Sequence, residues 1–151
     1  MGVDAEHGKV VMLHDCIFCR ILAHQLPASF VVEDETTVAF LSLRQPVPGH
    51  VLVVPRRHVP TIYDLAPDEG AAVMNLAVRV ARGLRHIYAP AGLNLWQSNG
   101  GIAGQEIDHF HLHLQPRQAG DGIWDVYPNG VPAPRPRTYL DELAAQLRPH
   151  I

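Results

Sequence analysis

The sequence predicts an α+β fold, in which a mostly antiparallel sheet of about five strands packs with one long helix and a short C-terminal helix. Two observations support this class. Short segments rich in β-branched and aromatic residues are separated by turns with proline, glycine or acidic residues, as in hairpin-linked strands. One long stretch repeats apolar residues at helical spacing. The chain has 151 residues, 47% of them hydrophobic and 18% charged, which suits one globular domain.

The expected strands follow one another along the chain with one helical interruption. The first two meet at an acidic turn, and the proline and glycine of "PVPGH" precede the third. The third, "HVLVVP", is apolar almost throughout, which indicates burial on both faces. The expected strands are residues 29–35, 36–43, 50–55, 93–99 and 109–116.

Two segments are expected to be helices. Residues 68–88 begin with acidic and end with basic residues, as the helix dipole favours. Residues 138–148 form the short helix, with Thr138 as its cap and Asp141 at the capping-box position. The apolar stripe of the long helix consists of Val73, Leu76, Ala77, Val80, Ala81, Leu84 and Ile87.

The chain is expected to have three parts: a flexible leader (residues 1–13), a folded domain (14–117) and a proline-rich tail carrying the short helix (118–151). No apolar run is long enough to span a bilayer, and the N-terminus lacks a secretory pattern, so we expect a cytoplasmic protein. The formal net charge of −3 gives no electrostatic case for binding nucleic acid or an anionic membrane.

The segment "HFHLHLQ" carries His109, His111 and His113 at alternate positions. In a strand these imidazoles share one face, and the apolar residues between them form the core face. Neighbouring histidines would lie roughly 7 Å apart, which is too far for all three to bind one metal ion. We therefore expect separate roles for them. The alternative is a polar stripe that faces solvent.

The glycine-rich loop "NGGIAGQ" precedes this segment. Its backbone N–H groups can form a concavity that binds phosphate, although such a loop can also be a simple hairpin connection. An unprotonated imidazole beside an anion site suits phosphoryl or nucleotidyl transfer.

The only cysteines, Cys16 and Cys19, form a CxxC pair. In a protein without an export signal, this spacing favours metal binding or redox chemistry over a structural disulfide, and it supplies half of a tetrahedral zinc site. The redox alternative lacks a thioredoxin-like βαβ context. Two free thiols are the remaining alternative.

These motifs together resemble the histidine-triad (HIT) superfamily of nucleotide hydrolases and transferases. Besides "HFHLHLQ", the segments "DCIFCRI", "TTVAFLSLRQPVPGHVLVVPRRHV" and "LNLWQSNGGIAGQEIDHFHLHLQPR" occur in the order and spacing of that family. The resemblance covers residues 14–117 and is closest to the Hint-like branch of small bacterial members. It implies the HIT-like fold.

The resemblance also implies catalytic roles. His111 would be the nucleophile that attacks the α-phosphorus, and water would then hydrolyse the nucleotidyl-histidine. A backbone carbonyl would fix the tautomer of its ring. His113 would contact the phosphate and help to orient or protonate it, and His50 matches a further histidine that faces the α-phosphate.

Substrate-binding positions follow from the same comparison. Asn99 and Gln105 match residues that bind phosphate oxygens and the leaving group, and Gly104 lets the backbone approach closely. Leu43 fits the position beside the base. Two residues depart from the family pattern: Ser42 replaces a carboxylate that binds the ribose hydroxyls, and Glu106 stands where serine or threonine is common.

In many bacterial members two histidines complete the zinc site, and here these match His58 and His109. The expected cofactor is a structural zinc ion, and the expected partners are a purine nucleotide such as AMP and a second copy of the chain. Trp124 and the tail would reach the partner's active site or pack locally. Two alternatives remain: a diadenosine polyphosphate hydrolase, and a nucleotide- or zinc-binding module with little turnover.

Overall fold

A computed structural model describes residues 15–123 and 127–151 of the chain. The expected leader and Trp124 lie outside the described residues. The chain divides into two compact units, Met1–Asp121 and Gly122–Ile151. None of the helices within the described ranges is long and apolar enough to cross a membrane.

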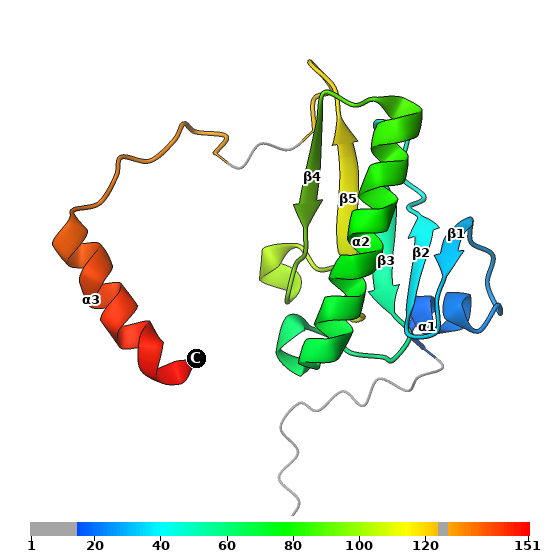
Figure 1. Cartoon of the computed structure of the whole chain (residues 1–151), viewed down its shortest axis with the longest axis horizontal. Helices are drawn as coiled ribbons and strands as arrows, with labels where there is room; N and C mark the ends of the chain where they lie inside the picture. The colour runs from blue at the N-terminus through cyan, green and yellow to red at the C-terminus, as the bar shows by residue number, and fades with distance from the viewer. Residues whose placement is uncertain (1–14, 124–126) are drawn as a thin grey trace, which may run out of the picture. The chain divides into compact units, whose positions relative to one another are not determined.

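The first unit is built on one five-stranded sheet with the order β1-β2-β3-β5-β4, and all neighbouring strands are antiparallel (Figure 1). This confirms the predicted α+β class with a largely antiparallel sheet. The strands are β1 (Phe30–Glu33), β2 (Thr37–Leu41), β3 (Val51–Pro55), β4 (Gly92–Trp96) and β5 (Leu112–Arg117).

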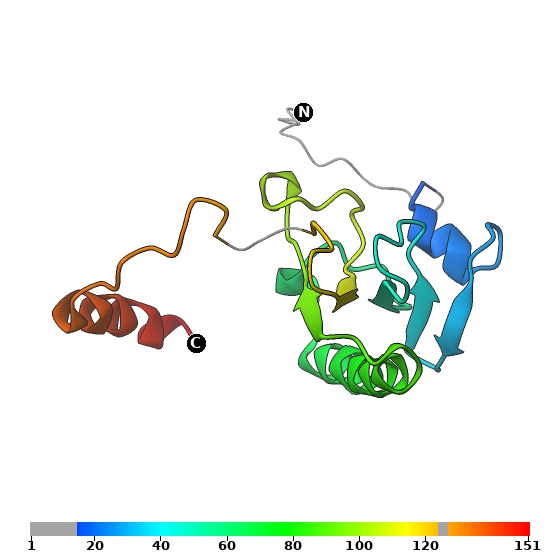
Figure 2. The ribbon, with the colours of Figure 1, turned by 90° about the horizontal axis from the view of Figure 1, so that it is seen from above.

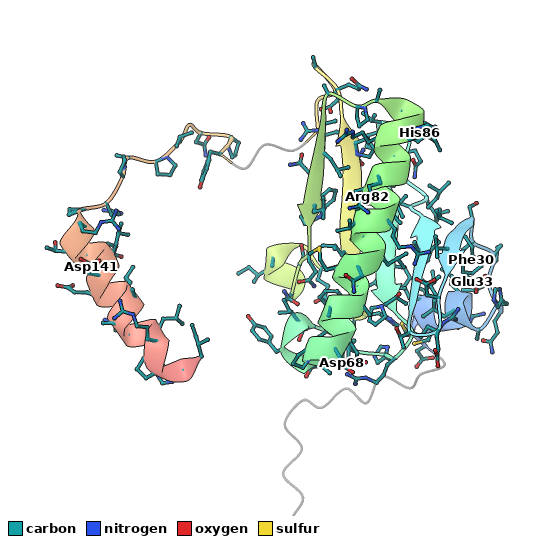
Figure 3. The ribbon with its side chains drawn as sticks, in the orientation of Figure 1. Phe30, Glu33, Asp68, Arg82, His86 and Asp141 are labelled. Atoms are coloured by element: carbon teal, nitrogen blue, oxygen red, sulfur yellow. The ribbon has the colours of Figure 1, made fainter. Side chains whose placement is uncertain are left out.

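The long helix α2 (Pro67–Tyr88) covers one face of the sheet. Its first turn carries Asp68 and its last turn His86, both labelled in Figure 3, as the helix dipole favours. Its buried face packs on apolar side chains of β2, β3 and β5, which confirms most of the predicted stripe. The residues of α2 in this core are Val73, Leu76, Ala77, Val80, Leu84 and, partly buried, Ala81.

The last turn of α2 differs from the prediction. Ile87 is 71% exposed, so its place in the stripe was wrong. The turn instead approaches Gly49 through Tyr88 and Leu84: a Cβ at Gly49 would lie 3.0 Å and 2.8 Å from their side chains. Gly49 also has a φ of +101°, which favours glycine. This close approach places the segment that leads into β3.

The opposite face of the sheet is covered in part by α1 (Ile17–Leu22), as Figure 2 shows. Phe18 and Ile21 of α1 pack against apolar residues of β2 and β3. This helix was not predicted because its six residues are too few to show a helical repeat. The Cys16 side chain caps it by accepting a hydrogen bond from the Cys19 backbone N–H at 3.5 Å.

The last strand is shorter than predicted and begins at Leu112. Before it, the backbone N–H of His109 donates to the Ile107 carbonyl, and that of Phe110 donates to the Val59 carbonyl. The bond from Phe110 to Val59 ties this segment to the loop after β3, and the chain enters the sheet only afterwards. Two short 3₁₀ turns, Ile62–Asp64 and Gly101–Ala103, lie in the connecting loops.

The second unit carries α3 (Arg137–Leu147), followed by a 3₁₀ turn at Arg148–His150. The predicted cap at Thr138 was wrong. The helix begins one residue earlier, at Arg137, and its N-cap is Pro136, whose ψ of 147° is not helical. No described residue of α3 is buried, and its apolar side chains Leu140, Leu143 and Leu147 are exposed.

Candidate functional site

Four potential metal ligands from three separate segments meet at one end of the sheet. Cys16 and Cys19 come from the start of α1, His58 follows β3, and His109 precedes β5. One ligand atom from each residue lies within 4.8 Å of the others. The structure therefore brings together the four residues that the resemblance assigned to the metal.

The distances fit a tetrahedral ion. The Sγ of Cys19 lies 3.3 Å from Nδ1 of His58 and 3.6 Å from Nδ1 of His109, and the Sγ of Cys16 lies 3.5 Å from Nδ1 of His109. With Zn–S and Zn–N bonds of about 2.3 and 2.0 Å, adjacent S and N ligands of tetrahedral zinc are about 3.5 Å apart. This Cys₂His₂ cluster can bind a metal ion.

The protonation of the cluster also suits a metal. His109 is fully buried, which lowers its pKa to about 4, and its Nε2 donates to the Pro55 carbonyl at 2.9 Å. Its Nδ1 therefore carries the lone pair that faces the sulfur atoms. Burial, together with the Cys16 thiol, raises the pKa of Cys19 to about 12, and a cation would reverse that shift by binding the thiolate.

The three alternate histidines have three different surroundings, as expected. Only His113 lies within β5, whereas His109 and His111 precede the strand. The apolar residues between them still point the other way, because Phe110 and Leu112 belong to the core beneath α2. The single flat strand assumed from the sequence was thus wrong, and the three rings have different hydrogen-bond partners.

His111 is held in one tautomer. Its Nδ1 donates to the carbonyl of His109 at 2.7 Å, so Nε2 carries the lone pair. Burial lowers the pKa of the imidazole, which keeps it uncharged near neutral pH. The ring of Phe18 lies nearly perpendicular to it, with centroids 5.2 Å apart, and the centroid of the His113 ring lies at 4.8 Å. This is the protonation state that a nucleophilic histidine requires.

A second chain of hydrogen bonds fixes His113. Nδ1 of His50 donates to the Arg44 carbonyl at 3.0 Å, so its Nε2 must accept. Nδ1 of His113 donates to that nitrogen at 3.0 Å, which leaves Nε2 of His113 as a lone pair. Burial lowers the pKa of both rings, that of His113 to about 3. Both are neutral at pH 7.

Trp96 is a site residue that the sequence reasoning missed. Its indole stacks on His113 with centroids 4.3 Å apart and planes 5° from parallel. The register of β4 against β5 places the two residues directly opposite each other. Alternation within the predicted strand could have placed Trp96 on one face, but no local signal gives the register.

The glycine-rich loop is fastened by Gln105. Its side-chain carbonyl accepts from the Gly100 N–H at 2.7 Å, and its amide donates to the carbonyls of Pro60 and Ile107. Gly100 and Gly104 have φ values of +84° and +90°, which favour glycine. The structure thus engages the Gln105 amide with the protein backbone, and a phosphate contact from it would replace one of these bonds.

Asn99 is also engaged within the protein. Its carbonyl oxygen accepts from the Ile62 N–H at 2.7 Å, and its amide donates to the side chain of Gln97 at 2.6 Å. The first contact joins the loop to Ile62, a few residues beyond His58 of the Cys₂His₂ cluster.

Ser42, Leu43, Arg44 and Glu106 form a group that we call the rim. Ser42 and Glu106 are the two residues that depart from the family pattern. Ser42 accepts a hydrogen bond from the Arg44 N–H at 3.2 Å, and Leu43 next to it is fully exposed. Arg44 forms an ion pair with Glu106 at 3.5 Å, with both side chains mostly exposed. Glu106 is close enough to His111 for its charge to oppose the lowering of that pKa.

Comparison with known proteins agrees with this arrangement. The HIT domain profile matches residues 23–120. "Protein hit" of Bacillus subtilis is 38% identical over 114 residues, which cover 75% of this chain and 79% of that protein. Adenosine 5'-monophosphoramidase hnt1 of Schizosaccharomyces pombe is 32% identical over 117 residues, which cover 75% and 85%.

Solved structures show the same fold. A HIT family member from Bacillus subtilis superposes with a TM-score of 0.83 at 32% identity, over 91% of this chain and 97% of that one. A zinc-bound histidine triad protein from Mycobacterium smegmatis gives 0.68 at 29% identity, over 91% and 99%. The chain therefore belongs to the HIT domain family.

Proposed function

We propose that this protein is a hydrolase that cleaves purine nucleoside phosphoramidates, such as conjugates of AMP, at the α-phosphate. The observation that carries the proposal is His111: an uncharged imidazole whose Nδ1 is tied to a backbone carbonyl, so that the Nε2 lone pair is free. A phosphoramidase activity also stands in the printed name of the fission-yeast relative.

The chemistry proceeds in two steps. Nε2 of His111 attacks the α-phosphorus, and the phosphorus–nitrogen bond to the leaving group breaks. The negative charge of the bound substrate favours the protonated form of His113. The leaving nitrogen keeps the electron pair of the broken bond and takes a proton from Nε2 of His113. Water then attacks the nucleotidyl-histidine, returns a proton to His113 and releases AMP.

Zinc would be held by Cys16, Cys19, His58 and His109. All four positions are protein ligands, which makes the site structural, and a zinc-bound relative supports this choice of ion. The carbonyl of His109 accepts the Nδ1–H of His111, so fixing His109 also fixes the nucleophile.

The rim would receive the rest of the substrate. Leu43 offers an exposed apolar surface beside the base, and Ser42 would give the ribose one hydrogen bond where a carboxylate could accept two. The backbone at Gly104 can approach the phosphate because nothing among the described residues crowds its α-carbon. Asn99 and Gln105 would shape the phosphate loop, and Glu106 would lie beside the leaving group.

A diadenosine polyphosphate hydrolase is the second candidate. The exposed guanidinium of Arg44 at the rim would favour an anionic leaving group, whereas Glu106 would favour an amine. Comparing diadenosine polyphosphate with adenosine phosphoramidate as substrates separates the two.

A homodimer is part of the proposal. A sheet that continues across two copies needs a free edge strand, and β1 and β4 form the two edges of this sheet. Light scattering on the purified full chain would give the mass of the assembly.

The test is release of AMP from adenosine phosphoramidate by the wild type and by His111→Ala. We expect the variant to lose at least about 10³-fold in rate, since it lacks the nucleophile. His86→Ala, at an exposed position on α2, is the matched control and should keep full activity. Equal slow release by the wild type and His111→Ala would remove the proposal, and AMP binding without turnover would leave a nucleotide-binding module.

A further inference from the structure

Three aromatic rings form a cluster beside the nucleophile: Trp96, His113 and His50. The stacked pair Trp96–His113 is the closest, and the His50 ring lies 5.2 Å from His113 and 5.5 Å from Trp96. The three residues come from β4, from β5 and from the segment before β3. Because paired strands hold Trp96 opposite His113, the sheet itself sets this contact.

The cluster restrains His113 in three ways. The indole covers one face of the imidazole, Nδ1 of His113 donates to Nε2 of His50, and the backbone of His113 is held within β5. Nε2 remains as the one ring nitrogen without a bond to these neighbours. A flat aromatic cover also keeps water from that face of the ring, which disfavours a charge on it.

We infer that Trp96 is a positioning residue for His113: the indole holds the imidazole in the orientation and tautomer that leave Nε2 available, and it shields the ring so that it stays uncharged until substrate binds. The inference rests on the proposed function, in which His113 passes a proton to the leaving group and takes one back from water. Trp96 itself does not need to contact the substrate.

The groups around His113 explain why removal of Trp96 should raise the pKa of His113. The titratable side chains that face it are His50 and His111, both of which are held neutral by burial. The ion pair of Arg44 with Glu106 is mostly exposed to solvent, which screens its charges. Trp96 has no charge, so it acts through shielding and orientation. Its removal should therefore raise the pKa of His113 from about 3 towards the ordinary value of 6.5.

The test uses the full-length, zinc-loaded protein with Trp96→Leu and Trp96→Phe. Leucine keeps an apolar side chain without a ring, whereas phenylalanine keeps a ring that can stack. Leu95→Ala is the matched control, because the side chain of this neighbouring β4 residue points to the other face of the sheet. Nitrogen-15 NMR of the imidazoles gives the tautomer and the pKa of His113 without any need for turnover.

We expect Trp96→Leu to raise the pKa of His113 by about one unit or more and to mix its tautomers, whereas Trp96→Phe and Leu95→Ala change little. In the phosphoramidate assay, Trp96→Leu should lower kcat by about tenfold with a smaller change in KM, and it should shift the pH profile in the direction of the raised pKa of His113. Trp96→Phe should recover most of kcat.

The outcomes separate the two claims. If Trp96→Leu lowers only the melting temperature and leaves the His113 pKa, its tautomer and the pH profile unchanged, the indole is merely structural and the inference is overturned. If the wild type shows no turnover, the proposed function is lost, but the NMR titration still decides whether Trp96 positions the ring.

Discussion

The proposed nucleophile, His111, lies between two histidines that are alike in sequence and unlike in surroundings. His109, two residues before His111, faces two cysteines and a histidine through Nδ1, and its Nε2 is bound to a carbonyl. His113, two residues after, faces His50 through Nδ1 and keeps Nε2 free. Burial keeps both rings neutral. The neighbours of Nδ1 and Nε2 therefore differ between the two rings, and they suit His109 to the proposed metal site and His113 to the proposed proton transfer.

The largest effect is expected at the metal end. Removal of zinc should lower the free energy of unfolding by about 4 kcal/mol relative to protein in zinc at about a thousandfold above its dissociation constant. Cys19→Ser should abolish this zinc dependence, because oxygen is a poor replacement for a thiolate. Thermal melts with and without a chelator measure both. A wild type whose melting temperature ignores zinc would contradict the assignment of Cys16, Cys19, His58 and His109.

The next largest effect is expected at Gly49, which leads into His50, the hydrogen-bond partner of His113. Gly49→Ala should cost about 2–3 kcal/mol in stability, because a Cβ would clash with Leu84 and the φ of +101° is strained for alanine. The matched control is Gly83→Ala within α2, where no described atom lies within 4 Å of the added Cβ. That change should stabilise the protein by up to about 1 kcal/mol.

Urea unfolding of the two glycine variants gives both signs. Equal effects would mean that the close approach of α2 to residue 49 does not hold the segment before β3.

The pH dependence of stability should be governed by the buried histidines. The pKa of His113 is about 3 in the folded protein and 6.5 when unfolded, so between these values the unfolded chain binds more protons. Its contribution to stability is therefore complete above pH 6.5 and is lost as the pH falls towards 3. The pKa of His50 is shifted in the same direction.

Urea unfolding of zinc-loaded protein at pH 7.5 and at lower pH measures this loss. His113→Gln should show a shallower decline than the wild type, and His86→Gln, at an exposed position, should follow the wild type. A decline that is unchanged in His113→Gln would show that this ring does not resist protonation.

The smallest effect on stability is expected at the rim. Arg44→Ala should change the free energy of unfolding by no more than about 0.5 kcal/mol, because its ion pair with Glu106 is exposed. Its effect should appear in substrate choice: without the guanidinium, anionic leaving groups should react more slowly relative to amines. Glu106→Gln should shift the preference the other way. Parallel assays with adenosine phosphoramidate and diadenosine polyphosphate measure the ratio, and equal ratios would place both side chains outside substrate recognition.

The sequence predicts what local repeats encode. The apolar period of α2 and the β-branched strands can be recognised without knowledge of the elements that they pack against. The fold class could therefore be predicted, and the structure confirms it. The errors occur where a distant contact decides. Ile87 fits the helical period, but the last turn packs through Tyr88. His109 fits an alternating strand, but its N–H bonds to Ile107 and the next residue, Phe110, bonds to the loop after β3, so the segment stays outside the sheet.

The same limit applies to the site. The CxxC spacing of Cys16 and Cys19 indicates half of a possible metal site. The other two candidate ligands, His58 and His109, lie 39 and 90 residues after Cys19 and could be predicted only from the family resemblance. Trp96 was missed because its role depends on the register between β4 and β5, which no single strand reveals.

The most direct test of the central claim is to look for the covalent intermediate. Protein mixed with adenosine phosphoramidate is quenched within the first turnovers, digested, and examined by mass spectrometry under conditions that preserve phosphorus–nitrogen bonds. An AMP group on Nε2 of His111, absent from His111→Ala, is the predicted result. AMP release at full rate with no nucleotide on this residue, or with the nucleotide on His113 instead, would contradict it.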